Sequence, residues 1–172
     1  MTTARRALVA GLCAVLPLLA PAAEPRWLEV RSLHSGESAT VRWEAESPLD
    51  DEARAQLRHV LRDRRNGAEM DLDPALFDLL VDLAKEAGVD PRYDVISAYR
   101  SPESNAKMRA RSDGVAEKSL HMQGRAIDVR LRGVDTLRLA ELARALGRGG
   151  VGYYPGDGFV HVDTGRVRHW DG

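Results

Sequence analysis

Apolar side chains recur at helical spacing in some segments of this chain of 172 residues and at strand spacing in others. The order in which these segments follow one another constrains the fold more than any other feature of the sequence. Helical spacing predicts amphipathic helices over 50–65, 73–88 and 135–147, and Ser101-Pro102 begins a short helix towards Arg111. Alternating or β-branched runs predict strands over 28–33, 39–43, 93–99, 125–131, 151–154 and 159–163. Because these elements interleave without regular parallel units, we expect a single α+β domain whose mainly antiparallel sheet is flanked by helices.

The first two predicted strands enclose a short polar segment, His34-Ser35-Gly36-Glu37. A glycine-containing link of this length is typical of a β-hairpin, and we expect the hairpin to cover one edge of the domain. The mature chain then divides into an N-terminal hairpin over 24–48 and a core that carries the chemistry over 49–172.

Residues 1–23 have the layout of a secretory signal peptide. Two arginines precede an apolar run over 7–20, and small residues follow it. A membrane span is the alternative, but the run is shorter than the roughly 20 apolar residues that a bilayer requires, and Pro17 interrupts it. We therefore expect cleavage after Ala22 or Ala23 and export, by the Sec or the Tat route, to the periplasm or another extracytoplasmic compartment, without a stable membrane anchor.

Composition excludes several classes of function. A net charge of −1 and 5% aromatic residues provide neither the basic surface nor the stacking surface that nucleic acid requires. Signal cleavage would remove Cys13, the only cysteine, so we expect neither a disulfide nor a catalytic thiol. No coiled-coil pattern or long apolar edge is present, and a monomer is the expected state.

The informative segment is Ser119 to Asp128, together with the strand 159–163. His121, Asp128 and His161 carry the nitrogen and oxygen donors that zinc prefers, and a catalytic zinc takes three such ligands and leaves one position for water. Strand alternation places Asp128 away from the apolar face, and Gly124 allows the preceding loop to turn towards it. The alternative at this point is that the two histidines are ordinary hydrogen-bonded surface or core residues and bind no metal.

The pattern Ser-x-His-x-x-Gly-x-Ala-x-Asp over 119–128 resembles the signature of zinc D-alanyl-D-alanine carboxypeptidases and dipeptidases. The mature chain as a whole more closely resembles the murein endopeptidase K (YcbK-like) family, in six blocks that occur in the same order: 33–37, 61–65, 96–102, 119–128, 149–155 and 159–165. This resemblance implies one zinc ion per chain, held in a cleft on the sheet by His121, Asp128 and His161. The implied partners are the stem peptides and cross-links of peptidoglycan.

The resemblance also implies that Arg100 reaches into the cleft towards the peptide. A guanidinium can hold a substrate carboxylate through two parallel hydrogen bonds, although a solvated arginine at a strand end is the alternative. Ser119 is expected to hydrogen-bond near the metal or the substrate, because no His-Asp pair is placed to make it a nucleophile if both histidines bind zinc. The expected nucleophile is a water activated by the metal.

The general base is the least defined part of the expected site. Related carboxypeptidases place an acid three residues before the last zinc histidine, where this chain has Gly158. We favour Asp163, which shares a strand face with His161 and would take a proton from the water or orient a ligand. Asp157, on a turn, is an alternative, and His169 could assist if the C-terminal tail folds back.

The sequence thus predicts a zinc-dependent murein endopeptidase that hydrolyses amide bonds in peptidoglycan cross-links. Two alternatives remain open: a non-catalytic peptidoglycan-binding or regulatory protein, and a carboxypeptidase that trims stem peptides. The sequence does not choose between cross-links that join D-alanine to diaminopimelate and those that join two diaminopimelates.

Overall fold

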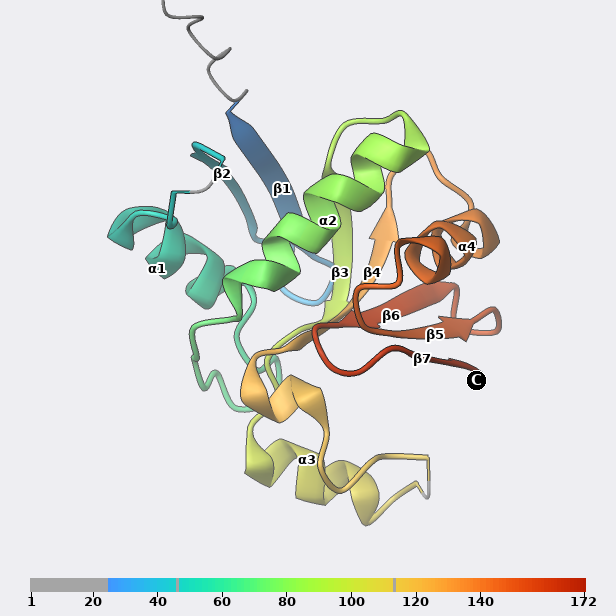
Figure 1. Ribbon diagram of the computed structural model, residues 1–172. Coiled ribbons are helices and arrows are strands. Elements are labelled where there is room, and N and C mark those ends of the chain that lie inside the picture. Colours follow the sequence, from blue (N-terminus) through green and yellow to red (C-terminus); the bar gives the residue numbers. More distant parts are fainter. Residues whose placement is uncertain (1–24, 46, 113) are drawn as a thin grey trace, which may run out of the picture.

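The computed structural model describes residues 25–45, 47–112 and 114–172, so the predicted signal peptide lies outside the described residues. In these ranges one sheet has the strand order β2-β1-β3-β4-β6-β5-β7 (Figure 1). The strands are β1 (Arg26–Ser32), β2 (Ser38–Trp43), β3 (Arg92–Ser97), β4 (Ala126–Leu131), β5 (Gly150–Tyr154), β6 (Phe159–Asp163) and β7 (Arg168–Asp171). The helices are α1 (Asp51–Val60), α2 (Pro74–Ala87), α3 (Pro102–Arg109), α4 (Thr136–Leu146) and a 3-10 turn, η1 (Leu120–Gln123). None of the helices described is long and apolar enough to cross a membrane.

The sheet confirms the predicted α+β class but is mixed. Strands β1 and β2 form the predicted antiparallel hairpin at one edge. The β3/β4, β4/β6 and β5/β6 pairs are also antiparallel, whereas β1/β3 and β5/β7 are parallel. Strand β7 was not predicted, because four residues are too few to show a clear alternation. The other strands end within two residues of their predicted limits.

The helices begin and end where capping chemistry predicts. Asp73 and Asp135 accept hydrogen bonds from the first backbone N–H groups of α2 and α4, and Pro74 occupies the first turn of α2. Gly88 and Gly147 end these helices in the left-handed conformation. The limits of both helices are therefore fixed by local sequence.

Helix α1 is shorter than predicted, because it ends at Val60 and does not continue to Arg65. The chain leaves the helical path so that Asp63, which is 1% exposed, can point inward. Its carboxylate accepts hydrogen bonds from the backbone N–H groups of Arg65, at 2.9 Å, and of Ser101, at 2.8 Å. These bonds tie the loop after α1 to the segment after β3.

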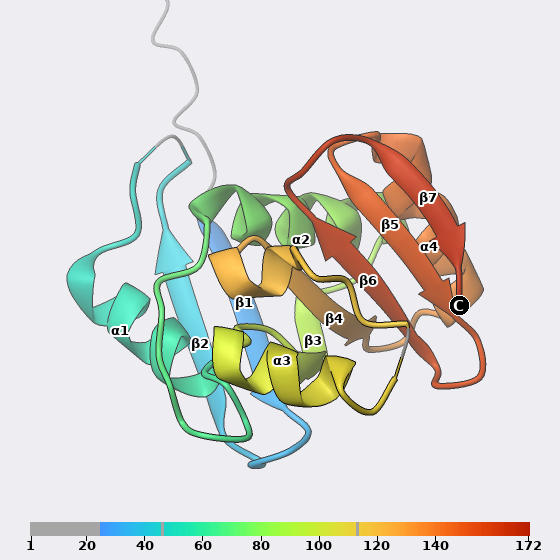
Figure 2. The same ribbon diagram turned by 90° about the horizontal axis from the view of Figure 1, so that it is seen from below.

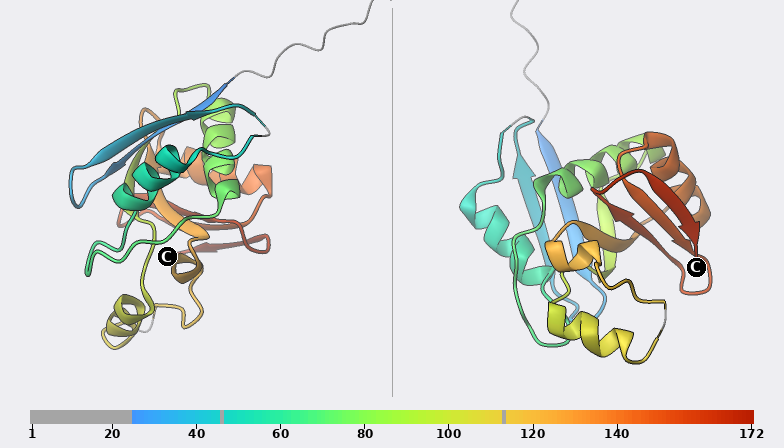
Figure 3. Two further views of the ribbon diagram at one scale, coloured as in Figure 1. Left: turned by 90° about the vertical axis from the view of Figure 1, so that its left-hand side faces the viewer. Right: turned by 60° about the horizontal axis from the view of Figure 1, so that its bottom comes forward.

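The hydrophobic core lies between one face of the sheet and helices α1, α2 and α4. Helix α1 packs on β1 and β2, α2 on β1 and β4, and α4 on β4, β5 and β6. The core side chains from β4 and β6 are Ile127, Val129, Leu131, Val160 and Val162. Figure 2 shows α3 and η1 on the side of the sheet opposite to α2 and α4, and Figure 3 shows the same separation from two further directions. The face of the sheet next to α3 and η1 is therefore the one opposite to the hydrophobic core, and we call it the polar face. This face is the one that can carry a site.

Candidate metal centre and cleft

Strand register brings two of the candidate ligands together on the polar face. Asp128 on β4 pairs directly with His161 on β6, while the neighbouring pairs Ile127 with Val162 and Val129 with Val160 point into the core. Directly opposed residues in an antiparallel pair have Cβ atoms about 5 Å apart. The alternation that buries the core therefore also places a carboxylate beside an imidazole.

The third candidate ligand, His121, comes from η1, immediately before β4. Gly124 ends this turn with φ 65°, and a side chain there would meet the backbone oxygen of Asp71 at 2.8 Å. Only glycine fits both this conformation and this close approach. The turn carries His121 back over the sheet towards Asp128, as the sequence predicted.

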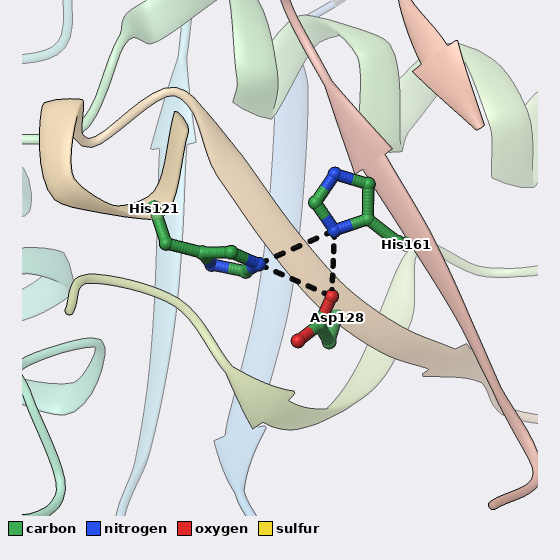
Figure 4. Close-up of side chains that lie close together, drawn as sticks. All are labelled: His121, Asp128 and His161. Atoms are coloured by element: carbon green, nitrogen blue, oxygen red, sulfur yellow. Dashed lines mark hydrogen bonds and ion pairs between the residues drawn. The ribbon is translucent and has the colours of Figure 1, made fainter. Parts of the chain in front are cut away.

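The three side chains converge as a metal site requires (Figure 4). Nε2 of His121 lies 3.3 Å from Oδ1 of Asp128 and 3.2 Å from Nδ1 of His161, and Nδ1 of His161 lies 2.8 Å from the same Oδ1. Donors about 2.0 to 2.1 Å from a tetrahedral zinc lie roughly 3.3 Å from one another. The spacing of the donor atoms fits such an ion.

The far nitrogen of each ring is held from behind. Nδ1 of His121 donates to the backbone oxygen of Ala98 at 2.7 Å, and Nε2 of His161 donates to Oδ2 of Asp163 at 3.1 Å. A carbonyl and a carboxylate accept only, so in a neutral ring the lone pair is left on the nitrogen that faces Asp128. Metal-binding histidines are usually oriented in this way.

The electrostatics of the cluster favour a cation. Burial opposes ionisation of Asp128, yet the charges and hydrogen bonds of His121 and His161 outweigh it and hold the pKa of this carboxyl well below its usual range. Burial likewise lowers the pKa of His161, but the carboxylates of Asp128 and Asp163 raise it further than burial lowers it. The carboxylate of Asp128 is therefore ionised, and it offers a negative charge to a divalent ion bound between the two rings.

Asp163 lies behind His161, away from the ligand atoms. It is fully buried and accepts hydrogen bonds from the backbone N–H groups of Gly150 and Gly165 and from the guanidinium of Arg168. Burial alone would raise its pKa, but the hydrogen bonds from His161, from Arg168 and from the two backbone groups hold the pKa far below the usual range. The carboxylate is therefore ionised, and its oxygens are engaged with these donors.

The C-terminal tail folds back as β7, but it presents Trp170 and not His169 to the site. Gly152 on β5 pairs with both His161 and Trp170, and the indole lies across this glycine. The rings of Trp170 and His161 are 5.2 Å apart, whereas His169 is exposed. The sequence analysis did not identify Trp170 as a residue of the site. The available signal was the two-residue spacing of Arg168 and Trp170, which places both side chains on the same face of a strand.

The cluster lies in a cleft with a volume of 710 Å³, whose wall includes Arg100, Ser119, Tyr154 and Asp157. Arg100 is 8% exposed; one guanidinium nitrogen donates to Asn105 at 3.3 Å, while Nε has no partner. Burial lowers the pKa of Arg100. The hydroxyl of Ser119 makes no capping bond to η1. Both side chains predicted to bind substrate therefore retain hydrogen-bonding capacity in the cleft.

Asp157 lies on the turn between β5 and β6, four residues before His161. At about 3.3 Å per strand residue this places it up to about 13 Å along the chain from His161. Its backbone oxygen accepts a hydrogen bond from Arg130 at 2.8 Å. Asp157 is thus a residue of the cleft rim.

Comparison with known proteins adds evidence that is independent of this geometry. A family model described as peptidoglycan L,D-endopeptidase MepK matches residues 20–170. The chain is 41% identical over 146 residues to the peptidoglycan L,D-endopeptidase MepK of Escherichia coli (strain K12) and to that of Shigella flexneri, which covers 85% of this chain and 80% of each relative. It is 37% identical over 150 residues to the probable peptidoglycan L,D-endopeptidase MepK of Haemophilus influenzae, which covers 87% of this chain and 81% of the relative. No solved structure matches the chain.

Proposed function

The chain belongs to the peptidoglycan L,D-endopeptidase MepK family, and on that premise we propose that it is a zinc-dependent murein endopeptidase that hydrolyses amide bonds in peptidoglycan cross-links. Family membership supports the reaction class. The observation that carries the proposal is the convergence of His121, Asp128 and His161 in the cleft. This cluster provides a place for the metal of a metallopeptidase.

The donor set suits one zinc ion per chain. Two imidazole nitrogens and one carboxylate oxygen at tetrahedral spacing are typical of a catalytic zinc site with a fourth position free. When bound, zinc polarises the scissile carbonyl and lowers the pKa of a water to about 7, which supplies a nucleophile without a catalytic thiol or hydroxyl. The chain's own residues then bind and orient the peptide.

Arg100 is the proposed anchor for a substrate carboxylate. Its Nε is buried without a partner, and leaving such a donor unpaired costs free energy that a bound carboxylate would restore. Ser119 lies on the same cleft wall and is proposed to donate a hydrogen bond to the peptide. The assignment of Arg100 agrees with the role that the resemblance implied, and that of Ser119 with the role expected from the sequence.

Asp163 is proposed to orient His161. The sequence left two roles open for it, proton acceptor or orienting group, and its position behind the ring supports the second. By accepting the Nε2 proton, Asp163 keeps the lone pair of Nδ1 directed at the ligand cluster. Asp163 thus acts through His161 as a positioning residue.

The bond cut is proposed to join two diaminopimelates. The names of the relatives specify a bond between an L centre and a D centre. In a cross-link between two diaminopimelates the carbonyl comes from an L centre and the amine from a D centre, whereas D-alanine contributes a D-centre carbonyl. Peptidoglycan lies outside the cytoplasmic membrane, so the proposal also requires export, in agreement with the predicted signal peptide.

The test is incubation of the purified mature chain with defined muropeptide dimers of both cross-link types, with zinc or with a chelator, and analysis by mass spectrometry. His161→Ala is the matched control that lacks one ligand. Zinc-dependent conversion of the dimer linked through two diaminopimelates into monomers is the expected result. Loss of only a terminal residue would indicate a carboxypeptidase, and binding without cleavage by the zinc-loaded protein would contradict the enzymatic function.

A further inference from the structure

The wall of the cleft beyond the ligand cluster is strongly cationic. Its charged side chains are Arg64, Arg65, Arg100, Lys118, Arg130 and Arg168 against Asp128 and Asp157. Arg168 is paired with the buried Asp163, and Arg130 donates to backbone oxygens of the β5–β6 turn. Arg100 donates to Asn105, whereas the side chains of Arg64, Arg65 and Lys118 form no ion pair with any of the residues described.

Arg64 and Arg65 are the clearest case. Both side chains are exposed, and neither makes a hydrogen bond or an ion pair with any part of the chain that the structure describes. Partial burial and the positive charges of Arg64 and Arg100 lower the pKa of Arg65, although the charge of Asp63 opposes them. Arg64, Arg65 and Arg100 line the same cleft, and their like charges repel one another. An anion between them would relieve this repulsion.

The loop that carries the two arginines is fixed to the segment that carries Arg100. The backbone N–H of Tyr99 donates to the oxygen of Leu61 at 3.1 Å, and the side-chain amide of Asn66 donates to the hydroxyl of Ser101 at 2.9 Å. Together with the bonds from Ser101 and Arg65 to Asp63, these contacts hold the two segments in a fixed relative position. Binding of a ligand then requires little ordering of the backbone, and this favours affinity.

Asp63 is the acid nearest to Arg64 and Arg65 in sequence, and its charge raises the pKa of Arg65, but its oxygens are bound to backbone groups. Its buried carboxylate accepts backbone hydrogen bonds and forms no ion pair with either arginine. Arg64 and Arg65 are thus available to a ligand at the cleft wall, while the carboxylate of Asp63 stabilises the loop.

A further cavity adjoins these arginines. A second cavity of 310 Å³ shares Arg64 and Arg65 with the first and extends to Ser32 and His34, beside the β1–β2 hairpin. Arg64 and Arg65 therefore lie between the cleft that holds His161 and Arg100 and this second cavity.

We propose that Arg64 and Arg65 form a second carboxylate subsite, which binds the free α-carboxylate of the D-glutamate in the stem peptide. The proposal rests on the proposed function, since a cross-linked stem peptide carries several free carboxylates. The backbone N–H of Arg100 donates to the backbone oxygen of His121 at 3.2 Å, so Arg100 is adjacent to a candidate metal ligand, and we assign it the carboxylate beside the scissile bond. The more distant pair then takes the carboxylate of a residue farther along the stem.

The test compares the zinc-loaded mature chain, Arg64→Gln/Arg65→Gln, and Arg31→Gln, a control that removes an exposed charge outside the cleft. The substrates are cross-linked dimers with free carboxylates, with the glutamate α-carboxylate amidated, or with the diaminopimelate carboxylate amidated. The expected result is a rise in KM of about tenfold for the double variant on the free dimer, with kcat unchanged, which is about the effect of one charge-assisted hydrogen bond. On the glutamate-amidated dimer the double variant and the unaltered protein should have the same KM.

An equal KM for the double variant and the unaltered protein on the free dimer would overturn the proposal. So would an effect that survives glutamate amidation, or one that disappears only when diaminopimelate is amidated. Binding of the same dimers by calorimetry, with the zinc-free proteins, gives the same comparison as a ratio of Kd values. If the unaltered protein cleaves nothing, the proposed function fails, and the Kd ratio still decides whether the subsite exists.

Discussion

Asp163 accepts the Nε2 proton of His161 at 3.1 Å, on the side of the imidazole ring that faces away from Asp128 and His121. The opposite nitrogen, Nδ1, lies within hydrogen-bond distance of the ligand atoms of both. A carboxylate in this position determines which nitrogen carries the proton and how the ring is turned. This geometry supports an orienting role for Asp163 over the role of a general base, and the two roles can be distinguished by experiment.

Asp163→Asn should weaken zinc binding by roughly 10- to 100-fold, because the ring of His161 loses the anion that orients it. Activity should be lost at limiting zinc and recover when zinc is raised. Asp157→Asn, an acid of the cleft rim, should bind zinc as the unaltered protein does. Competition with a chromogenic chelator measures both affinities. Full zinc affinity of Asp163→Asn combined with a loss of kcat that excess zinc does not restore would instead indicate a general base.

Gly152→Ala should destabilise the protein by about 1 to 3 kcal/mol, because a Cβ at this position would lie 2.5 Å from the indole of Trp170. The cost should fall sharply in a Trp170→Leu background, where the clash is absent. Urea unfolding of the four proteins of this double-mutant cycle gives the coupling free energy. An equal cost of Gly152→Ala in both backgrounds would show that the indole does not occupy the space above Gly152.

Asp63→Asn should lower the free energy of unfolding by about 1 to 3 kcal/mol at pH 7, because the backbone N–H groups of Ser101 and Arg65 lose an ionised acceptor. Burial alone would raise the pKa of Asp63, but hydrogen bonds from Ser104, Arg65 and Ser101 outweigh it and hold the pKa below its usual value. The ionised form therefore stabilises the fold above about pH 4, and this contribution is lost as the pH falls through the folded-state pKa.

The measurement for Asp63 is urea unfolding of the unaltered protein and Asp63→Asn at a series of pH values from 7 to 3. The difference in free energy between the two proteins should shrink as the pH falls. A difference that stays constant over the whole range would mean that the charge of Asp63 contributes nothing.

Zinc should stabilise the folded chain, because it neutralises the buried carboxylate and satisfies the two ring nitrogens that face it. At a free zinc concentration 100 times Kd the gain is about 2.7 kcal/mol, and a chelator should remove it. Asp128→Asn, which keeps the shape and removes the charge, should lose most of the gain, whereas the exposed Asp90→Asn should retain it. Thermal unfolding with and without zinc measures the effect, and an equal zinc response in Asp128→Asn would argue against this site.

Much of the fold could be read from local patterns, since caps and periodicity are properties of neighbouring residues. Asp73 with Pro74 and Gly88 predicted the limits of α2, and the alternation in 125–131 predicted both β4 and the outward direction of Asp128. Strand β7 and the early end of α1 were not predictable in this way. The first depends on pairing with β5, and the second on the bond between Asp63 and Ser101, 38 residues apart.

The sequence by itself determined which donor groups the candidate site contains, because the residue types and their spacing within 119–128 and 159–163 are local and resemble a known signature. Only the tertiary structure decided where other residues lie around that site. The place of Asp163 behind His161, the indole of Trp170 over Gly152 and the free arginines beside Arg100 all depend on contacts between distant segments. Such contacts follow from strand register and from loops fixed across the sheet, and no local pattern records them.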